Sequence, residues 1–220
     1  MKDKTVEIVI NILLPIVSLI IALVAIFQTK KQIELSNKQH LFDRRLEKYI
    51  IVKDLLSLYS ENREIIVDRE DLIRCVECQF SGLTNVSYLT DMIFAINEPL
   101  KSDKQNVFLS KCEMLEKYAV EISLLWDNDI GQIFSEFVKT YKELLNKLYK
   151  QRVCISLIDN YNKGEIYSTG IKQNSTVTDK QMLDNAKRMK LFETINEIDR
   201  IYNRIINENL EQKLIDDLKL

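Results

Sequence analysis

Few side chains in this sequence have the type and spacing needed for catalysis or metal binding. Cys75 and Cys78 form a C-x-x-C motif, the spacing of a zinc half-site or of a redox-active dithiol. Zinc needs four ligands, and the other candidates, His40, Cys112 and Cys154, are scattered without a paired spacing. A thioredoxin-like site needs a βαβ context, which the sequence does not suggest. We interpret the cysteine pair as small apolar residues of a helix, with metal or redox chemistry as the alternative.

The sequence offers few candidates for acid–base catalysis, because His40 is the only histidine. It lies in a polar stretch, and we expect a solvated surface residue there. The sequence has no glycine-rich phosphate loop, no serine elbow and no paired-aspartate motif. We therefore expect neither an enzyme nor a cofactor.

Two basic clusters are candidates for binding an anionic ligand, such as a nucleotide or oligonucleotide. The candidate residues are Lys139, Lys142, Lys147, Lys150 and Arg152 in the first cluster and Lys187, Arg188 and Lys190 in the second, which also contains Lys180. In the first, only Glu143 opposes the cations, and Tyr141 and Tyr149 are available to stack on bases. The clusters would meet if the polar stretch 161–178 folds back. The alternative is that they are solvated helix faces.

A third candidate is a seam of small and polar residues in an apolar segment. Residues 8–27 carry no charge, and a helix of this length spans roughly 30 Å, the thickness of a bilayer's hydrocarbon core. The seam consists of Asn11, Pro15, Ser18, Ala22, Ala25 and Thr29, at steps of 4, 3, 4, 3 and 4. In lipid, helices associate through such small residues and through hydrogen bonds from Asn and Ser.

This spacing predicts that the segment faces copies of itself in a homo-oligomer, because a 3.5-residue period keeps one face toward a partner. A pore would be lined by Asn11, Ser18 and Thr29, with Ala22 and Ala25 forming an apolar constriction. The alternative is an anchor that dimerises through its small residues and conducts nothing.

The surroundings of the apolar segment favour a single-pass membrane protein. A cleaved signal peptide would have a shorter apolar run and a small-x-small site, which is missing after Phe27. Lys2 and Lys4 precede the segment, and six lysines and arginines follow it between Lys30 and Lys48, so we expect the C-terminal body in the cytoplasm of a bacterial cell and the N-terminus outside. The near-neutral net charge of −2 gives no general reason to expect nucleic acid.

The rest of the chain reads as long helices, since it has only 4 glycines and 2 prolines. Apolar residues recur at steps of 3 and 4 in three later stretches. They are Phe108, Cys112, Leu115, Ala119, Ile122 and Trp126; Ile130, Phe134, Phe137, Tyr141, Leu144 and Leu148; and Leu191, Ile195, Ile198, Tyr202 and Ile205. The first two stretches, joined at residues 127–129, predict an antiparallel helical hairpin.

Boundaries follow from local signals. The stripe Phe42, Leu46, Tyr49, Leu56 and Tyr59 predicts a helix that begins to bury one face and ends at residues 60–62. A second helix is predicted over 63–80, a loop over 81–85 and a short apolar segment over 86–96. Ser102 with Gln105, and Thr178 with Gln181, predict capping boxes, and the last helix is predicted to run unbroken from residue 179 nearly to the end.

The sequence therefore predicts an all-α fold. Residues 1–29 form a transmembrane segment with a short external tail, 30–60 a juxtamembrane stalk helix, and 61–220 a cytoplasmic bundle of long antiparallel, coiled-coil-like helices.

Residues 36–49, SNKQHLFDRRLEKY, carry a resemblance to known proteins. They resemble the juxtamembrane segment of small bacterial membrane proteins with the form K-Q-x-x-F-[DE]-[KR]-R-x-x-x-Y. Some proteins of this general plan are similar to the membrane effectors of anti-phage systems of the retron, cyclic-oligonucleotide and Hailong types. The resemblance covers about residues 28–56 and carries over no functional residue. It implies a helical domain that senses a nucleic-acid signal and a membrane part that permeabilises the cell.

We accordingly expect a membrane-embedded oligomeric effector, a ligand- or partner-gated pore that permeabilises the bacterial inner membrane in anti-phage defence. Its partners would be the membrane, copies of itself, and a nucleotide signal or a protein encoded nearby. The alternative is a membrane-tethered helical scaffold or signalling module that does not conduct.

Overall fold

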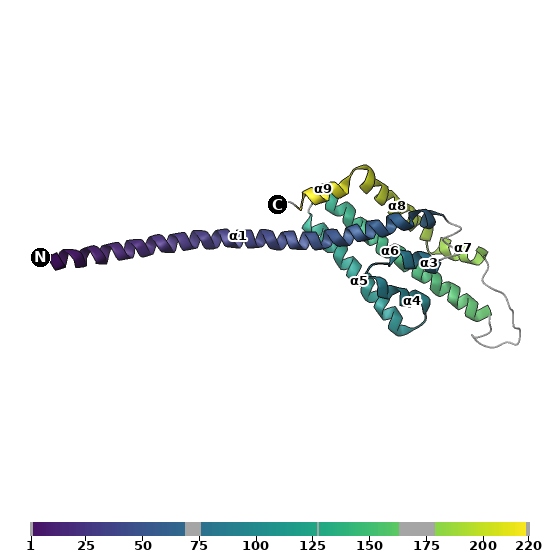
Figure 1. Cartoon of the computed structure of the whole chain (residues 1–220). Helices are drawn as coiled ribbons and strands as arrows, with labels where there is room; N and C mark the ends of the chain where they lie inside the picture. The colour runs from purple at the N-terminus through teal and green to yellow at the C-terminus, as the bar shows by residue number, and fades with distance from the viewer. Residues whose placement is uncertain (1, 69–75, 127, 163–178, 219–220) are drawn as a thin grey trace. The chain divides into compact units, whose positions relative to one another are not determined.

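The computed structural model is all-α in the residues that it describes, which are 2–68, 76–126, 128–162 and 179–218 (Figure 1). Side chains of residues 2–13, 159–162 and 179–180 lie outside this description. The helices are α1 (Lys2–Val67), α3 (Val76–Leu83), the 3-10 turn η1 (Thr90–Met92), α4 (Ile93–Asn97), α5 (Ser102–Leu125), α6 (Asp129–Asn162), α7 (Asp179–Arg188), α8 (Leu191–Asn207) and α9 (Leu210–Asp216). The predicted fold class is confirmed.

Helix α1 belongs to two compact units, one holding its residues up to Arg44 and the other beginning at Arg45. It continues without interruption through Pro15, which lies inside the helix. It also continues past residues 60–62, where we predicted its end. The Asn62 amide donates to the Leu58 carbonyl at 2.8 Å within the helix, and Ile66 is fully buried. Packing thus extends the helix by more than a turn beyond the predicted end.

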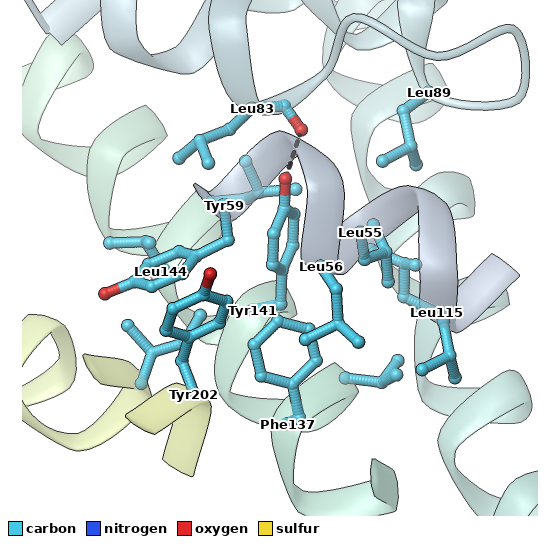
Figure 2. Packing of buried hydrophobic residues seen from close by; sticks show 14 of the residues in the cluster. Leu55, Leu56, Tyr59, Leu83, Leu89, Leu115, Phe137, Tyr141, Leu144 and Tyr202 are labelled. Carbon is cyan, nitrogen blue, oxygen red and sulfur yellow. Dashed lines mark hydrogen bonds between the residues drawn. The ribbon is translucent and has the colours of Figure 1, made fainter. Parts of the chain in front are cut away.

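In the second unit, residues 45–67 of α1 pack one wide face against the other helices of the bundle. The buried apolar side chains of this face include Ile51, Val52, Leu55, Leu56, Leu58 and Tyr59, whereas Ile50, Lys53 and Ser57 on the opposite face are exposed. Figure 2 shows Leu55, Leu56 and Tyr59 meeting side chains from α3, α5, α6 and α8. The segment that follows the apolar stretch in sequence therefore supplies part of the core of the bundle.

The predicted seams of the later helices form this core. Every seam residue of α8 is buried, and on α5 and α6 only Cys112 and Ile130 are partly exposed. Helices α5 and α6 pack along each other as the predicted hairpin. The turn between them is tight, since a Cβ on Gly131 would lie 2.0 Å from the Trp126 carbonyl oxygen. Asn128 caps α6 by accepting a hydrogen bond from the Gly131 N–H at 2.8 Å.

Several predicted boundaries are wrong. The helix predicted over 63–80 is divided between α1, which ends at Val67, and α3, which begins at Val76 and runs into the predicted loop. Lys101, not Ser102, occupies the cap position of α5, and it makes no side-chain capping bond, so the first capping box does not form. The second capping box, at Thr178, lies outside the described residues, as does most of the stretch 161–178.

The predicted last helix is broken twice, into α7, α8 and α9. The breaks lie at Lys190 and Asn209, whose φ angles of 56° and 51° are left-handed. The Lys190 carbonyl accepts a hydrogen bond from Lys147 Nζ on α6 at 3.2 Å. Asparagine tolerates the left-handed region better than most residues. Neither break contains Gly or Pro, so local sequence signals did not reveal them.

Candidate functional site

The apolar segment of α1 exposes large side chains in a way that water-soluble proteins avoid. Between residues 14 and 27, ten such side chains are 45–70% exposed, from Val17 at the lower limit to Phe27 at the upper. Single exposed apolar residues are ordinary, but a continuous surface of this kind marks an interaction with a membrane or another protein. Helix α1 is long and apolar enough here to cross a membrane, although a signal sequence passes the same test of length and composition.

The polar groups of the seam are hydrogen-bonded inside α1 itself. The Ser18 hydroxyl donates to the Leu14 carbonyl, and the Thr29 hydroxyl donates to the Ala25 carbonyl, both at 2.8 Å. Such bonds to the fourth preceding residue let a hydroxyl lie in lipid without another partner. Pro15, Ala22 and Ala25 are exposed on the same helix, and the Asn11 side chain lies outside the described residues. The role of the seam in an oligomer or pore stays a prediction.

At the start of the bundle, three polar side chains of α1 bind other helices; we call Arg45, Lys48 and Tyr49 the α1 clamp. Arg45 donates from Nε to the Leu125 carbonyl at the end of α5, at 3.0 Å, and from Nη1 to the Asp217 carbonyl after α9, at 2.8 Å. Its guanidinium also lies 5.7 Å from the centre of the Trp126 ring. One side chain thus joins the C-terminal ends of two helices to α1.

The other two members of the clamp reach α5 and α9. Lys48 is 6% exposed and lies 2.7 Å from both Glu121 and Glu47. Burial lowers the Lys48 pKa, but the hydrogen bonds to these carboxylates outweigh it and leave the pKa raised. The Tyr49 hydroxyl donates to Glu211 on α9 at 3.0 Å, and burial together with this bond raises the Tyr49 pKa to about 12. Both side chains keep their protons at neutral pH.

Sequence reasoning found Tyr49 but missed Arg45 and Lys48, because it followed apolar residues alone. The predicted stripe began with Phe42 and Leu46, but both are exposed, at 37% and 36%. The other stripe residues, Tyr49, Leu56 and Tyr59, are buried as predicted. The inward-facing register also includes Arg45, Lys48, Val52 and Leu55, which the stripe left out. The sequence did offer one signal, since the cationic residues Arg45 and Lys48 occur at the spacing of the buried residues that follow them.

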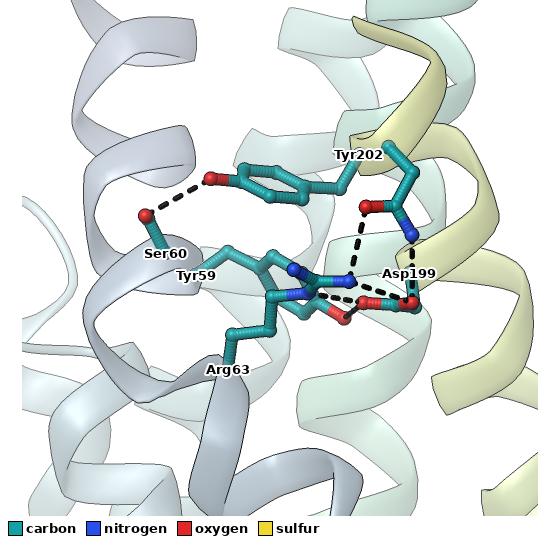
Figure 3. A network of polar contacts seen from close by, with 6 residues as sticks. Tyr59, Ser60, Arg63, Asp199 and Tyr202 are labelled. Atoms are coloured by element: carbon teal, nitrogen blue, oxygen red, sulfur yellow. Dashed lines mark hydrogen bonds and ion pairs between the residues drawn. The ribbon is translucent and has the colours of Figure 1, made fainter. Parts of the chain in front are cut away.

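A second polar network fastens the far end of α1 to α8 (Figure 3). Arg63 donates from Nε to Asp199 Oδ1 at 2.6 Å and from Nη2 to Oδ2 at 3.1 Å. The buried Tyr59 hydroxyl donates to the same carboxylate at 3.2 Å, and the Asn203 amide donates to it at 2.9 Å. The bond from Arg63 holds the Asp199 pKa below its usual range. Because Tyr59 and Arg63 both lie on α1, their bonds to one carboxylate of α8 constrain how α1 is rotated against α8.

The two basic clusters come together at one point, where Lys147 reaches the Lys190 carbonyl, but acids and backbone carbonyls already occupy part of them. Lys147 Nζ contacts Glu143 at 2.8 Å, Thr194 Oγ1 at 2.5 Å and the Lys190 carbonyl, which joins α6 to the start of α8. Lys142 pairs with Glu116, Arg152 lies 2.5 Å from Glu77, and Lys190 lies 3.5 Å from Glu193. The remaining candidates, Lys139, Lys150, Lys187 and Arg188, are exposed. Anion binding by the clusters stays a prediction.

The tyrosines expected to stack on bases are not available for stacking. Tyr141 is fully buried, and its hydroxyl donates to the Leu83 carbonyl at 2.6 Å (Figure 2). Tyr149 is 5% exposed, donates to the Pro99 carbonyl at 2.9 Å and stacks on Phe108 with ring centres 4.3 Å apart. This part of the nucleotide hypothesis is wrong, because both rings belong to the core.

The candidate thiols do not form a site among the described residues. Cys78 is exposed, and Cys75 lies outside the described residues. Burial raises the Cys112 pKa to about 11, so that thiol stays neutral. His40 is exposed on α1. In the described ranges, no three His, Cys, Asp or Glu side chains are grouped closely enough to hold a metal ion.

Comparison of the chain with protein-family models, with curated proteins and with solved structures finds no match. Its function must therefore be inferred from its own residues.

Proposed function

We propose that the chain is a membrane effector whose α1 segments associate through the seam, and whose helical bundle controls how those segments pack. The observation that carries the proposal is the continuous exposure of ten large apolar side chains between residues 14 and 27. Such a surface is most stable in hydrocarbon, because removing apolar area from water lowers the free energy by roughly 25 cal/mol for each Å².

The bundle has a direct means of acting on this segment, because one helix belongs to both units. The same α1 that carries the apolar residues supplies Val52, Leu55 and Tyr59 to the core. Ligand or partner binding that repacks the bundle must therefore act on α1. In the effector that we propose, this opens a pore between copies of α1 or assembles one. The resemblance of residues 36–49 to anti-phage membrane effectors supports a role in bacterial defence at the inner membrane.

Liposome flux and single-channel recording on the purified protein test conduction. Asn11→Leu and Ser18→Leu remove polar groups from the seam and are expected to abolish it. Ile20→Leu, a change of an apolar residue outside the seam, serves as the control and is expected to conduct as the wild type does. An oligomer that conducts under no condition would overturn the pore.

The second candidate is a membrane-tethered scaffold, favoured by the hydrogen bonds that Ser18 and Thr29 make within α1. Hydroxyls satisfied in this way do not require a polar partner helix. Replacing residues 5–28 by an unrelated membrane anchor separates the two functions. A scaffold keeps its activity after the exchange, whereas a seam-dependent effector loses it.

A further inference from the structure

We propose that α9 is an autoinhibitory latch, which holds the first turns of the bundle segment of α1 and releases them when it moves. The proposal rests on the proposed function only for its consequence in a membrane. The latch itself is a contact between α9 and the α1 clamp, and it is tested without any measurement of conduction.

The latch has an apolar base of three leucines. Leu210, Leu214 and Leu218 recur at steps of four and are 2%, 0% and 6% exposed; the first two lie on α9, which packs on α6 and α8, and Leu218 lies just beyond its end. A seven-residue helix has too few backbone hydrogen bonds to persist in isolation. Helix α9 therefore depends on its docking site, which makes docked and undocked states separable.

Three polar contacts then tie α9 to the place where α1 joins the bundle. Tyr49 donates to Glu211, and Arg45 donates to the Asp217 carbonyl, at 3.0 and 2.8 Å. Asn128 Nδ2 lies 3.1 Å from Asp217 Oδ2, so the residue that caps α6 also holds the end of α9. Two of the three members of the clamp thus lose a partner when α9 leaves.

The hinge of the latch is Asn209, which joins α8 to α9 with a left-handed backbone at φ 51° and ψ 43°. If residue 209 took right-handed helical angles, α8 would continue straight into α9. The three leucines could not then keep their present sites while α8 keeps its own. The conformation of a single residue therefore decides between a docked and an undocked α9.

Undocking of α9 would remove contacts of α1 at the start of its bundle segment, which directly follows the part of α1 in the other unit. Arg45 would keep its bond to the Leu125 carbonyl but lose the one to Asp217, and Tyr49 would lose its carboxylate. The bonds of Tyr59 and Arg63 to Asp199 on α8 would remain. The latch thus predicts local release of residues 45–52 while the far end of α1 stays fixed.

Hydrogen–deuterium exchange on the full chain in detergent micelles tests this, with a matched pair of variants at the hinge. Asn209→Ala penalises the left-handed backbone, and Asn209→Gly tolerates it; neither removes a side chain of the clamp. We expect Asn209→Ala to speed amide exchange roughly tenfold in residues 210–218 and together with it in residues 45–52, with α5, α6 and α8 unchanged. Asn209→Gly should exchange at the wild-type rate or more slowly.

Tyr49→Phe provides a second route that keeps the hinge intact. It removes one hydroxyl bond to Glu211 and should speed exchange in residues 210–218 by a smaller factor, roughly fivefold. Faster exchange in α9 with residues 45–52 unaffected in both variants would overturn the latch, as would equal acceleration throughout the bundle. Vesicle leakage then reports separately on function. Unchanged leakage with accelerated exchange would count against the pore and leave the latch standing.

Discussion

At the scale of single residues, the bundle is held in register by tyrosine hydroxyls as well as by apolar packing. Tyr141, Tyr149 and Tyr88 each donate to a backbone carbonyl on another part of the chain, at Leu83, Pro99 and Ile51. Each bond adds little net stability, but a packing that broke it would leave a buried carbonyl without a donor and carry the full cost of its desolvation. These bonds therefore act mainly by disfavouring other positions of the helices.

We expect Tyr141→Phe to lower the free energy of unfolding by about 1–3 kcal/mol, because it leaves the Leu83 carbonyl without its donor in a fully buried site. Urea unfolding followed by circular dichroism in detergent measures the loss. Tyr118→Phe is the matched control, since Tyr118 is only partly buried and the ring that Lys48 contacts is kept. A loss as large in Tyr118→Phe would show that the hydroxyl bond is not the cause.

The contribution of Asp199 to stability should depend on pH. Its pKa in the folded protein is lowered by Arg63, so the unfolded chain binds a proton more readily. The stabilisation is therefore present above the unfolded pKa of about 3.9 and is lost as the pH falls below that value toward the folded pKa. Asp199→Asn should cost about 1–3 kcal/mol at pH 7, and the difference from wild type should shrink by pH 3.

Urea titrations of the wild type and Asp199→Asn at both pH values measure this difference. Glu197→Gln, on the same helix and paired with Arg200 at an exposed site, should cost less than about 1 kcal/mol. A difference between wild type and Asp199→Asn that is the same at pH 3 and pH 7 would contradict the assignment.

At the scale of helices, the sequence predicted a buried face correctly where that face is apolar and failed where the face carries charged residues. The seams of α5, α6 and α8 are apolar and regular, and the structure buries nearly all of them. The inward face of α1 at the clamp carries Arg45 and Lys48, so an apolar pattern does not find it. The breaks at Lys190 and Asn209 depend on contacts between distant segments, such as that of Lys147 with the Lys190 carbonyl.

The same distinction applies to the candidate sites. The exposed apolar segment of α1 could be predicted because it is continuous in sequence. Occupation of the basic clusters could not, since Glu116 and Glu77 lie on α5 and α3, far in sequence from their partners Lys142 and Arg152. Tyr141 already lay on the predicted apolar seam, which counted against stacking, whereas the burial of Tyr149 was not apparent from the sequence.

The buried face of α1 predicts that residues 45–67 are required for folding of the bundle. Leu55→Ala should lower the free energy of unfolding by about 2–5 kcal/mol, because Leu55 is fully buried and its loss leaves a cavity. Ile50→Ala, on the same helix and 50% exposed, should cost less than about 1 kcal/mol. Thermal unfolding in detergent compares the two. Equal losses would mean that residues 45–67 are not part of the core.

At the scale of the whole molecule, the membrane protein that we propose has its entire bundle on one side of the bilayer. Lysines and arginines are more numerous after the apolar segment than before it, which predicts a cytoplasmic bundle. The bundle offers its own reporter of orientation, because Cys78 is exposed on α3. The buried surroundings of Cys112, which raise its pKa to about 11, keep that thiol largely unreactive.

We therefore expect a membrane-impermeant maleimide to modify Cys78 in inside-out membrane vesicles and to leave it unmodified in right-side-out vesicles or intact cells. Mass spectrometry of the Cys78 peptide measures the modification, and solubilisation in detergent should equalise the two preparations. Cys78→Ser identifies any contribution from the other cysteines. Modification in right-side-out vesicles alone would reverse the orientation. Equal modification in both preparations before detergent is added would contradict a bundle confined to one side of the bilayer, because only a bilayer between reagent and thiol makes the preparations differ.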